Sequence, residues 1–326
     1  MSLSKVRSGC GMATVGETKK RSAFNEKLKQ MKKDYQLYII LCPFVLFFIL
    51  FAYKPMAGLV IAFKDYRVFE GVWKSPWVGL ENYRVFFTSP YFVRIIRNTL
   101  LISIYSLIFA FPAPIILALL LNEAPSKKFK SVVQTCTYLP HFISAVVIVG
   151  IVTSFLSPGN GLINIIISSF GHEKIYFLSK PEYFRTIYIT MGIWQGVGYG
   201  SIVYIAAIAA IDPQLYEACT IDGGGRWKQM LHVTLPGIMP TIVTMFIMQI
   251  GRIMNVSYEK IILMYQPATY ETADVINSYV YRLGFDSTVP DYSLSTAVGL
   301  FNSVIGFILV LIANKISNKV NGSGLW

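Results

Sequence analysis

The sequence predicts an all-α membrane protein with six transmembrane helices. Of its 326 residues, 54% are hydrophobic and only 14% are charged, and the mean hydropathy is +0.53. This composition is too apolar for an ordinary soluble domain. Six charge-free stretches approach the roughly 20 residues that a helix needs to cross a bilayer core about 30 Å thick. These stretches do not alternate strictly between apolar and polar residues, so they indicate helices rather than barrel strands.

The six charge-free windows are Leu37–Tyr53, Thr99–Leu121, Tyr138–Leu156, Ile187–Ile211, Val233–Ile250 and Leu294–Asn314. They define a membrane domain over residues 35–319, preceded by a basic tail over residues 1–34 and followed by a short tail over residues 320–326. Pro112 and Pro114 predict kinks in the second window, because proline cannot donate a helical hydrogen bond.

Two shorter segments are expected at the membrane surface. The aromatic stretch Val72–Ser89 predicts an interfacial segment, since rings with polar tips favour the headgroup layer. The apolar run Leu162–Phe170 is too short to span and predicts an interfacial or re-entrant helix on the outer face.

The basic residues predict the orientation. The formal net charge is +12, but the Lys and Arg lie beside apolar windows and form no nucleic-acid-binding module, so anionic lipid is the expected partner. The tail, the cluster Lys127–Lys130, the loop after the fourth window and the C-terminal lysines fall on one side. The positive-inside rule makes that side cytoplasmic, with both termini inside. The segment from Lys64 to Arg97 departs from the rule, because its six basic residues would lie outside.

No enzyme or metal site is predicted. Four cysteines and three histidines are scattered, with no CxxC pair and no metal-ligand spacing. The six windows contain no acidic residue, whereas an ion-coupled secondary transporter would normally carry one near the bilayer midplane. A secondary transporter therefore remains the weaker alternative.

The loop after the fourth window carries the most informative pattern. Asp212 is a suitable N-cap and Pro213 suits the first helical position, so a short helix is expected to begin there. The glycines from Gly223 to Gly225 are expected to end it. Leu215, Ala218 and Cys219 follow i, i+3, i+4 spacing, which predicts one apolar stripe. A short rigid helix of this kind suits a groove in a partner protein.

This loop resembles the EAA loop of permease subunits in bacterial ABC importers. Glu217-Ala218-Cys219, then Gly223 and then Val233-x-Leu235-Pro236 follow the family's spacing. Cys219 replaces the second alanine of the family pattern, and Gly224 stands where alanine is common in the carbohydrate-uptake branch. The resemblance implies a type I ABC importer permease fold in the bacterial cytoplasmic membrane.

The resemblance also implies partners and a coupling surface. Two permease subunits would enclose the path, each loop would dock into one of two ATPase subunits, and an extracytoplasmic binding protein would deliver the solute. This chain would hold no cofactor, and ATP and Mg would bind the ATPase subunits. Gly223 is expected to permit a turn that a Cβ would obstruct, and Glu217 to cap the loop or pair with a partner. The residues implied in coupling are Tyr216, Glu217, Ala218, Asp222, Gly223, Arg226, Trp227 and Pro236.

Similarity to maltose permeases implies sugar contacts at five positions: Gly196, Tyr199, Gly251, Arg252 and Asn255. Tyr199 offers a stacking face, and Asn255 offers paired donor and acceptor groups. Arg252 would recognise a carboxylate, which favours a uronate-containing oligosaccharide, unless it extends to the outer headgroups instead. Strings such as Tyr53-Lys54-Pro55-Met56 resemble a subgroup that imports polysaccharide fragments. A permease for a non-sugar solute is the remaining alternative within the family.

Overall fold

The computed structural model describes residues 33–321 and divides the chain into an N-terminal unit ending at Val60 and a larger unit from Ile61 onward. Apart from a single antiparallel bridge between Lys64 and Trp77, the described secondary structure is helical. The expectation for the tail over residues 1–34 falls almost entirely outside the described residues.

The N-terminal unit is dominated by one long apolar helix. It consists of α2 (Tyr35–Phe48), the π-helical turn η1 (Ile49–Tyr53), α3 (Lys54–Met56) and η2 (Ala57–Phe63). The helix runs for 29 residues, and none of its most apolar window is buried. Its residues are apolar on all sides, as expected of a helix surrounded by lipid or by other apolar helices.

Three further helical stretches are long and apolar enough to cross a membrane. The first is α6 (Phe92–Tyr105), η3 (Ser106–Ala110) and α7 (Pro112–Glu123); the others are α11 (Pro181–Ala209) and α19 (Tyr292–Asn321). The irregularity predicted at Pro112 takes the form of the π-helical turn η3. Within that turn the Phe111 N–H donates to the Ser106 carbonyl, five residues back.

The third and fifth predicted windows are not straight helices. α8 (Lys127–Tyr138) and η4 (Leu139–Phe142) meet α9 (Ala145–Leu156) at 106°. The chain turns there because Ile143 and Ser144 are extended, and Ser144 caps the new helix by accepting a hydrogen bond from the Val147 N–H. Counting each bent pair as one span gives six spans, and counting only unbroken helices gives four.

The second bend lies after the informative loop. α13 (Arg226–Gln229), η6 (Met230–Thr234) and α14 (Leu235–Gly237) meet α15 (Met239–Gly251) at 57°. Pro240 has no N–H to donate into the preceding turn, so the helix changes direction there. Ile238, which is fully buried, holds the break in the core.

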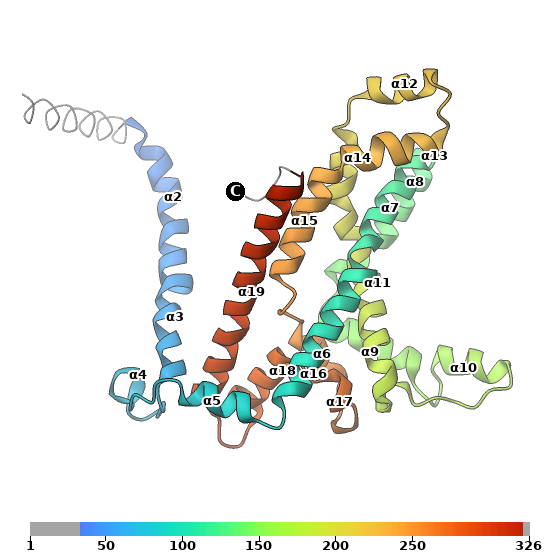
Figure 1. Ribbon diagram of the computed structural model, residues 1–326. Coiled ribbons are helices and arrows are strands. Elements are labelled where there is room, and N and C mark those ends of the chain that lie inside the picture. The colour runs from blue at the N-terminus through green and yellow to red at the C-terminus, as the bar shows by residue number, and fades with distance from the viewer. Residues whose placement is uncertain (1–32, 322–326) are drawn as a thin grey trace, which may run out of the picture. The chain divides into compact units, whose positions relative to one another are not determined.

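The larger unit has two distinct ends (Figure 1). α12 (Pro213–Ile221) and α13 lie at one end, and α16 (Tyr258–Met264), α17 (Tyr270–Ala273) and α18 (Ile276–Tyr281) lie at the other. α5 (Glu81–Thr88) lies at the second end as well. The topology prediction makes the α12 end cytoplasmic; this orientation stays a prediction.

Packing corrects one expectation at the second end. Phe86 lies within the predicted interfacial stretch, yet it is fully buried with Ile95, Tyr279 and Val298. It therefore joins α5 to α6, α18 and α19 rather than facing headgroups. Trp73 is 79% exposed and fits the interfacial prediction better. The short run after the α9 helix forms α10 (Leu162–Ser169), so the predicted helix there is confirmed.

Candidate functional site: the α12 loop and two cavities along α15

α12 begins where the sequence predicts. Asp212 is extended, and its Oδ1 accepts a hydrogen bond of 2.9 Å from the Gln214 N–H. Pro213 occupies the first helical position, where its missing N–H costs nothing. The cap satisfies one of the free N–H groups at the helix start and fixes the direction in which α12 leaves the end of α11.

α12 ends in a Schellman turn. Gly223 has a φ of +77°, and its N–H donates to the Thr220 carbonyl at 3.0 Å, while the Gly224 N–H donates to the Cys219 carbonyl at 2.8 Å. The predicted helix end is confirmed, and so is the prediction that the turn at Gly223 disfavours a Cβ. A Cβ at Gly223 would meet no atom within 4 Å, so the positive φ requires glycine there.

Gly224, unlike Gly223, is closely surrounded by other atoms. A Cβ at Gly224 would overlap the Cys219 Sγ and lie 2.6 Å from the Cys219 carbonyl oxygen. The two departures from the family pattern therefore belong together. The larger side chain at position 219 fills space that a side chain at position 224 would need.

The helix presents an exposed surface to solvent. Leu215 is 54% exposed, Ile221 86% and Trp227 72%. The predicted apolar stripe is mostly exposed as well, because only Cys219 of its three residues is partly buried. Within the described part of the chain, Glu217 is exposed and forms no hydrogen bond or ion pair. Five other residues implied in coupling are also exposed: Ala218, Asp222, Gly223, Arg226 and Pro236.

The back of α12 is tied to the turn that follows it. The Tyr216 hydroxyl lies 3.0 Å from the Thr234 Oγ1, and Thr234 is 1% exposed. Gln229 Nε2 donates to the Thr220 Oγ1 at 2.8 Å. These two links join α12 to α13 and η6, so a force on the exposed face passes directly to the bent pair that leads into α15.

Two cavities lie along α15. The larger, of about 390 Å³, is lined by Tyr199, Tyr204, Gln249 and Arg252 among others. The smaller, of about 100 Å³, lies nearer the α16 end and is lined by residues including Ser103, Ser106, Tyr188 and Asn255. Gln249 and Arg252 line both, so the two spaces adjoin at these side chains. Three of the five residues implied in sugar contact thus come together.

Arg252 is the C-cap of α15 and is exposed. Its guanidinium forms no hydrogen bond or ion pair with any other part of the chain that the structure describes. A cation without a partner, beside a polar cavity, is available to an anionic ligand.

Tyr199 is already stacked. The His141 ring lies parallel to it, with centroids 3.9 Å apart and an interplanar angle of 2°. One face of the tyrosine is therefore occupied, and a sugar would have only the other. Sequence reasoning missed His141, because the two residues come together only through the packing of η4 against α11.

The two glycines implied in sugar contact differ in their surroundings. A Cβ at Gly196 would meet no atom within 4 Å, whereas a Cβ at Gly251 would lie 2.5 Å from the Val310 Cγ2 of α19. Close packing of α15 on α19 is a sufficient reason for glycine at position 251. Neither glycine lines the two cavities.

Asn255 is held by a chain of amides. The buried Asn302 donates from its Nδ2 to Asn255 Oδ1 and to Asn277 Oδ1, both at 3.2 Å. Asn277 in turn donates to the Val256 carbonyl at 3.0 Å. Asn302 therefore orients the Asn255 amide rather than lining the cavity itself.

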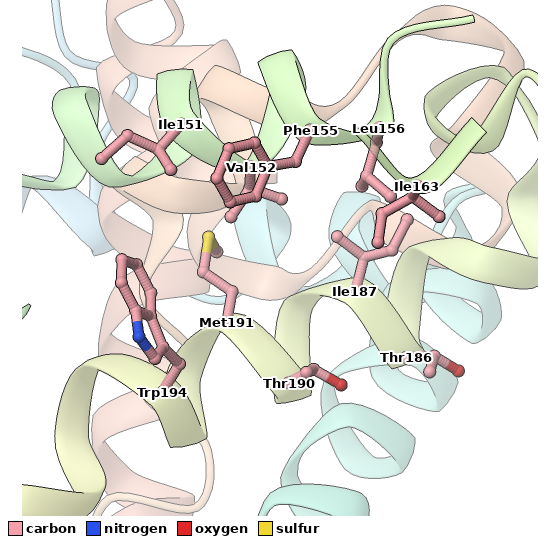
Figure 2. A pocket seen from close by; sticks show the side chains of 10 residues that line it. All are labelled: Ile151, Val152, Phe155, Leu156, Ile163, Thr186, Ile187, Thr190, Met191 and Trp194. Carbon is pink, nitrogen blue, oxygen red and sulfur yellow. The ribbon is translucent and has the colours of Figure 1, made fainter. Parts of the chain in front are cut away.

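A third cavity, of about 380 Å³, has a different character. Figure 2 shows apolar side chains of α9 facing those of α11 across it, with Trp194 at one end. Thr186 and Thr190 are the only hydroxyl-bearing residues of its lining. A sugar needs several hydrogen-bonding groups, so this space is not suited to one. Trp194 belongs to this apolar wall rather than to the cavities along α15.

Comparison with known proteins bears on both regions. Residues 110–322 match the family model described as "Binding-protein-dependent transport system inner membrane component". That match includes α12, its Schellman turn and the walls of the larger cavity from α7, α11 and α15, whereas Ile102, Ser103 and Ser106 of the smaller cavity lie before it. The chain belongs to this family. It is therefore a multi-pass inner membrane permease, as the loop pattern predicts.

Curated relatives cover nearly the whole permease. Protein LplB of Bacillus subtilis is 44% identical over 296 residues, which are 91% of this chain and 92% of the relative. The polygalacturonan/rhamnogalacturonan transport system permease protein YteP of the same organism is 43% identical over 314 residues, covering 96% of each chain.

A solved structure is similar over the same extent. A chain from the crystal structure of a bacterial ABC transporter involved in import of the acidic polysaccharide alginate is 46% identical. It has a TM-score of 0.84 and covers 91% of this permease and 99% of that chain. The same values hold for the alginate transporter in complex with alginate pentasaccharide-bound periplasmic protein.

Proposed function

We propose that this permease, together with a second permease subunit, forms the translocation path of an ATP-driven importer for an oligosaccharide that carries uronate residues. The observation that carries the proposal is the exposed α12 helix, capped by Asp212 and stopped by Gly223. A short, rigid and exposed helix of this kind can dock in a groove of a partner protein. The partners are two ATPase subunits, which bind ATP and Mg, and an extracytoplasmic binding protein that delivers the sugar.

The substrate class is supported by the relatives and by the cavity. YteP is named for polygalacturonan and rhamnogalacturonan, and the alginate transporter for an acidic polysaccharide. In this permease the unpartnered guanidinium of Arg252 lies between the two cavities, and a planar cation of this kind pairs bidentately with a carboxylate. Asn255 and Gln249 add donors and acceptors for sugar hydroxyls.

The proposed mechanism follows from the links behind α12. Closure of the ATPase subunits would move α12, and the Tyr216–Thr234 and Gln229–Thr220 hydrogen bonds would pass that movement to the bent pair and α15. The Arg252 end of α15 would then change its exposure between the two sides of the membrane. Such movement of a helix pair around a fixed site is the alternating access expected of a transporter.

Uptake in proteoliposomes tests the proposal. We expect uptake of a uronate oligosaccharide that requires ATP and the loaded binding protein and survives an uncoupler; loss with the uncoupler would favour the ion-coupled alternative. Gly223→Asp is expected to insert normally and abolish uptake. Arg252→Gln is expected to impair uptake of the uronate oligosaccharide more than that of a neutral one. Equal loss for both sugars would remove the carboxylate argument.

A further inference from the structure

The basic residues of the segment from Lys64 to Arg97 contradict the positive-inside rule, and most of them are internally paired. Lys64 is buried and donates to the Val72 and Trp73 carbonyls. Arg67 pairs with Asp65 and Glu70, Arg84 with Glu81, and Arg94 with Asp274. Arg97 is different, because its Nη2 makes a single long hydrogen bond of 3.5 Å to the Glu271 carbonyl. Its charge faces no carboxylate at ion-pair distance in the described chain.

The nearest buried acid is already saturated. Asp274 is fully buried, and it accepts from Arg282 at 2.8 and 3.1 Å, from Arg94 at 3.1 Å and from the Ser278 hydroxyl at 2.9 Å. Burial opposes the charge of Arg282, but its hydrogen bonds and attraction to Asp274 raise its pKa above the ordinary value. A carboxylate with four donors has no capacity for a third guanidinium.

A third guanidinium nevertheless lies beside this network. Arg185, in the first turns of α11, donates from Nη2 to Asn98 Oδ1 at 2.8 Å. Its Nε is buried and has no hydrogen-bond partner among the described residues. Asn98 Nδ2 in turn donates at 2.9 Å to the Glu271 carbonyl, the same oxygen that Arg97 contacts, so Arg97 and Arg185 approach one Asn98–Glu271 link. Two cations thus lie together with an unused donor, an arrangement that an anion would stabilise.

Arg185 and Asn98, the side chain that it contacts, lie one turn outside the smaller cavity. Tyr188 follows Arg185 by three residues, and Ile102 follows Asn98 by four, so each pair shares one face of its helix. Tyr188 and Ile102 both line the cavity that also holds Arg252 and Asn255. Three residues of helix advance by about 4.5 Å, so Arg185 stands just outside that cavity, towards the α17 end.

We propose that Arg97 and Arg185 form an outer carboxylate-binding station, where one uronate group of the substrate binds before another reaches Arg252. This inference rests on the proposed function. Its physical basis is that Arg97 and Arg185 would contact one carboxylate of a polyanionic substrate while Arg252 contacts another. Arg67, Arg84 and Arg94 are internally paired, whereas Arg97 and the exposed Lys74 keep a free charge. Of these two, Arg97 is the one that lies beside a second guanidinium, that of Arg185.

An anionic lipid headgroup presents similar chemistry and is the competing source. The geometry favours the substrate, because Asn98, the hydrogen-bond partner of Arg185, is fully buried and lies above the cavity wall. A headgroup would approach from the outer surface of the bundle instead.

Steady-state uptake in proteoliposomes with the complete importer tests the station. We expect Arg97→Gln and Arg185→Gln each to raise the KM for a uronate oligosaccharide about tenfold or more, with little change for a neutral oligosaccharide of the same length. Arg185→Lys keeps the charge and should recover part of the loss. Lys74→Gln is the matched control, since Lys74, on α4 (Gly71–Lys74), is an exposed outer cation that forms no ion pair or hydrogen bond with the part of the chain that the structure describes.

Three results would overturn the inference. One is an equal rise in KM for acidic and neutral sugars, and another is an effect of Lys74→Gln as large as that of Arg97→Gln. The third is loss of the effect in vesicles of neutral phosphatidylcholine, which would assign the site to lipid. If Arg185→Gln fails to assemble, Arg97→Gln decides, because its guanidinium contacts only a backbone oxygen. Absence of any oligosaccharide uptake by the unaltered importer would instead refute the proposed function.

Discussion

The three consecutive glycines after α12 provide a test of the coupling role proposed for this helix, because glycine is present at each position for a different physical reason. Gly223 has a φ of +77° and open space, Gly224 has no room for a Cβ, and Gly225 has open space and a φ of −79°. An L-residue in the left-handed region costs about 1–2 kcal/mol. Overpacking costs about 1–3 kcal/mol. Gly225 precedes α13 as its N-cap, where serine is preferred.

We therefore expect Gly223→Ala and Gly224→Ala to weaken association with the ATPase subunits, and Gly225→Ser to leave it unchanged. A cost of about 1–2 kcal/mol corresponds to a five- to thirtyfold fall in the ratio of correctly folded to misfolded loop. Gly223→Asn should recover most of the loss, because asparagine tolerates the left-handed region. Cys219→Ala should rescue Gly224→Ala only in part, since it removes the sulfur but not the carbonyl oxygen.

The assay is binding of the ATPase subunits to the purified permease pair, together with ATP hydrolysis stimulated by the loaded binding protein. Thermal unfolding of the permease pair in detergent serves as the control for global stability. Equal binding by Gly223→Ala and Gly225→Ser would refute the conformational argument. A Gly223→Asn variant as weak as Gly223→Ala would do the same. Strict additivity of Cys219→Ala and Gly224→Ala would show that the two positions do not share space.

Three further outcomes are expected. Asp212→Ala should destabilise α12 by about 1 kcal/mol through loss of its N-cap, visible as faster proteolysis of the loop, and Asp212→Ser should behave like the unaltered chain. Gly251→Ala should lower the unfolding temperature in detergent, because overpacking against Val310 costs about 1–3 kcal/mol, and Val310→Ala should restore it. Asp274→Asn should cost about 3–5 kcal/mol, since two guanidinium groups lose a buried counter-charge; an unfolding temperature equal to that of Asp274→Glu would contradict this.

The all-helical fold class and the two ends of α12 can be predicted from the sequence, because both depend on local chemistry. Aspartate before proline starts a helix, and glycine in a left-handed turn ends one, whatever surrounds them. The charge-free windows likewise reflect the bilayer rather than any tertiary contact. The family resemblance rests on these same residues and is confirmed.

The two bends were not predictable in the same way. Pro112 and Pro140 carry the same local signal, yet one gives a π-helical turn within a span and the other precedes a turn of 106°. Neighbouring helices decide which outcome follows, because they satisfy the freed carbonyl groups or leave them to the loop. The hydropathy of a sequence window does not show which helices will pack against it.

The cavity walls also depend on distant partners. Glycine at position 251 is required by Val310, and Tyr199 is half covered by His141. Residues this far apart in sequence leave no periodic pattern to find. The signal that was available, six outer basic residues against the topology rule, drew attention to this segment but did not distinguish the paired cations from the free ones.

The stack between His141 and Tyr199 has a mechanical consequence. His141 lies in η4, immediately before the sharp turn into α9, while Tyr199 lies in the middle of α11 and lines the larger cavity. Two aromatic planes in parallel contact slide easily but separate only with loss of their shared surface. Movement of η4 away from α11 would therefore separate the two rings, so the elbow between α8 and α9 and the wall of the larger cavity at Tyr199 are linked through this contact.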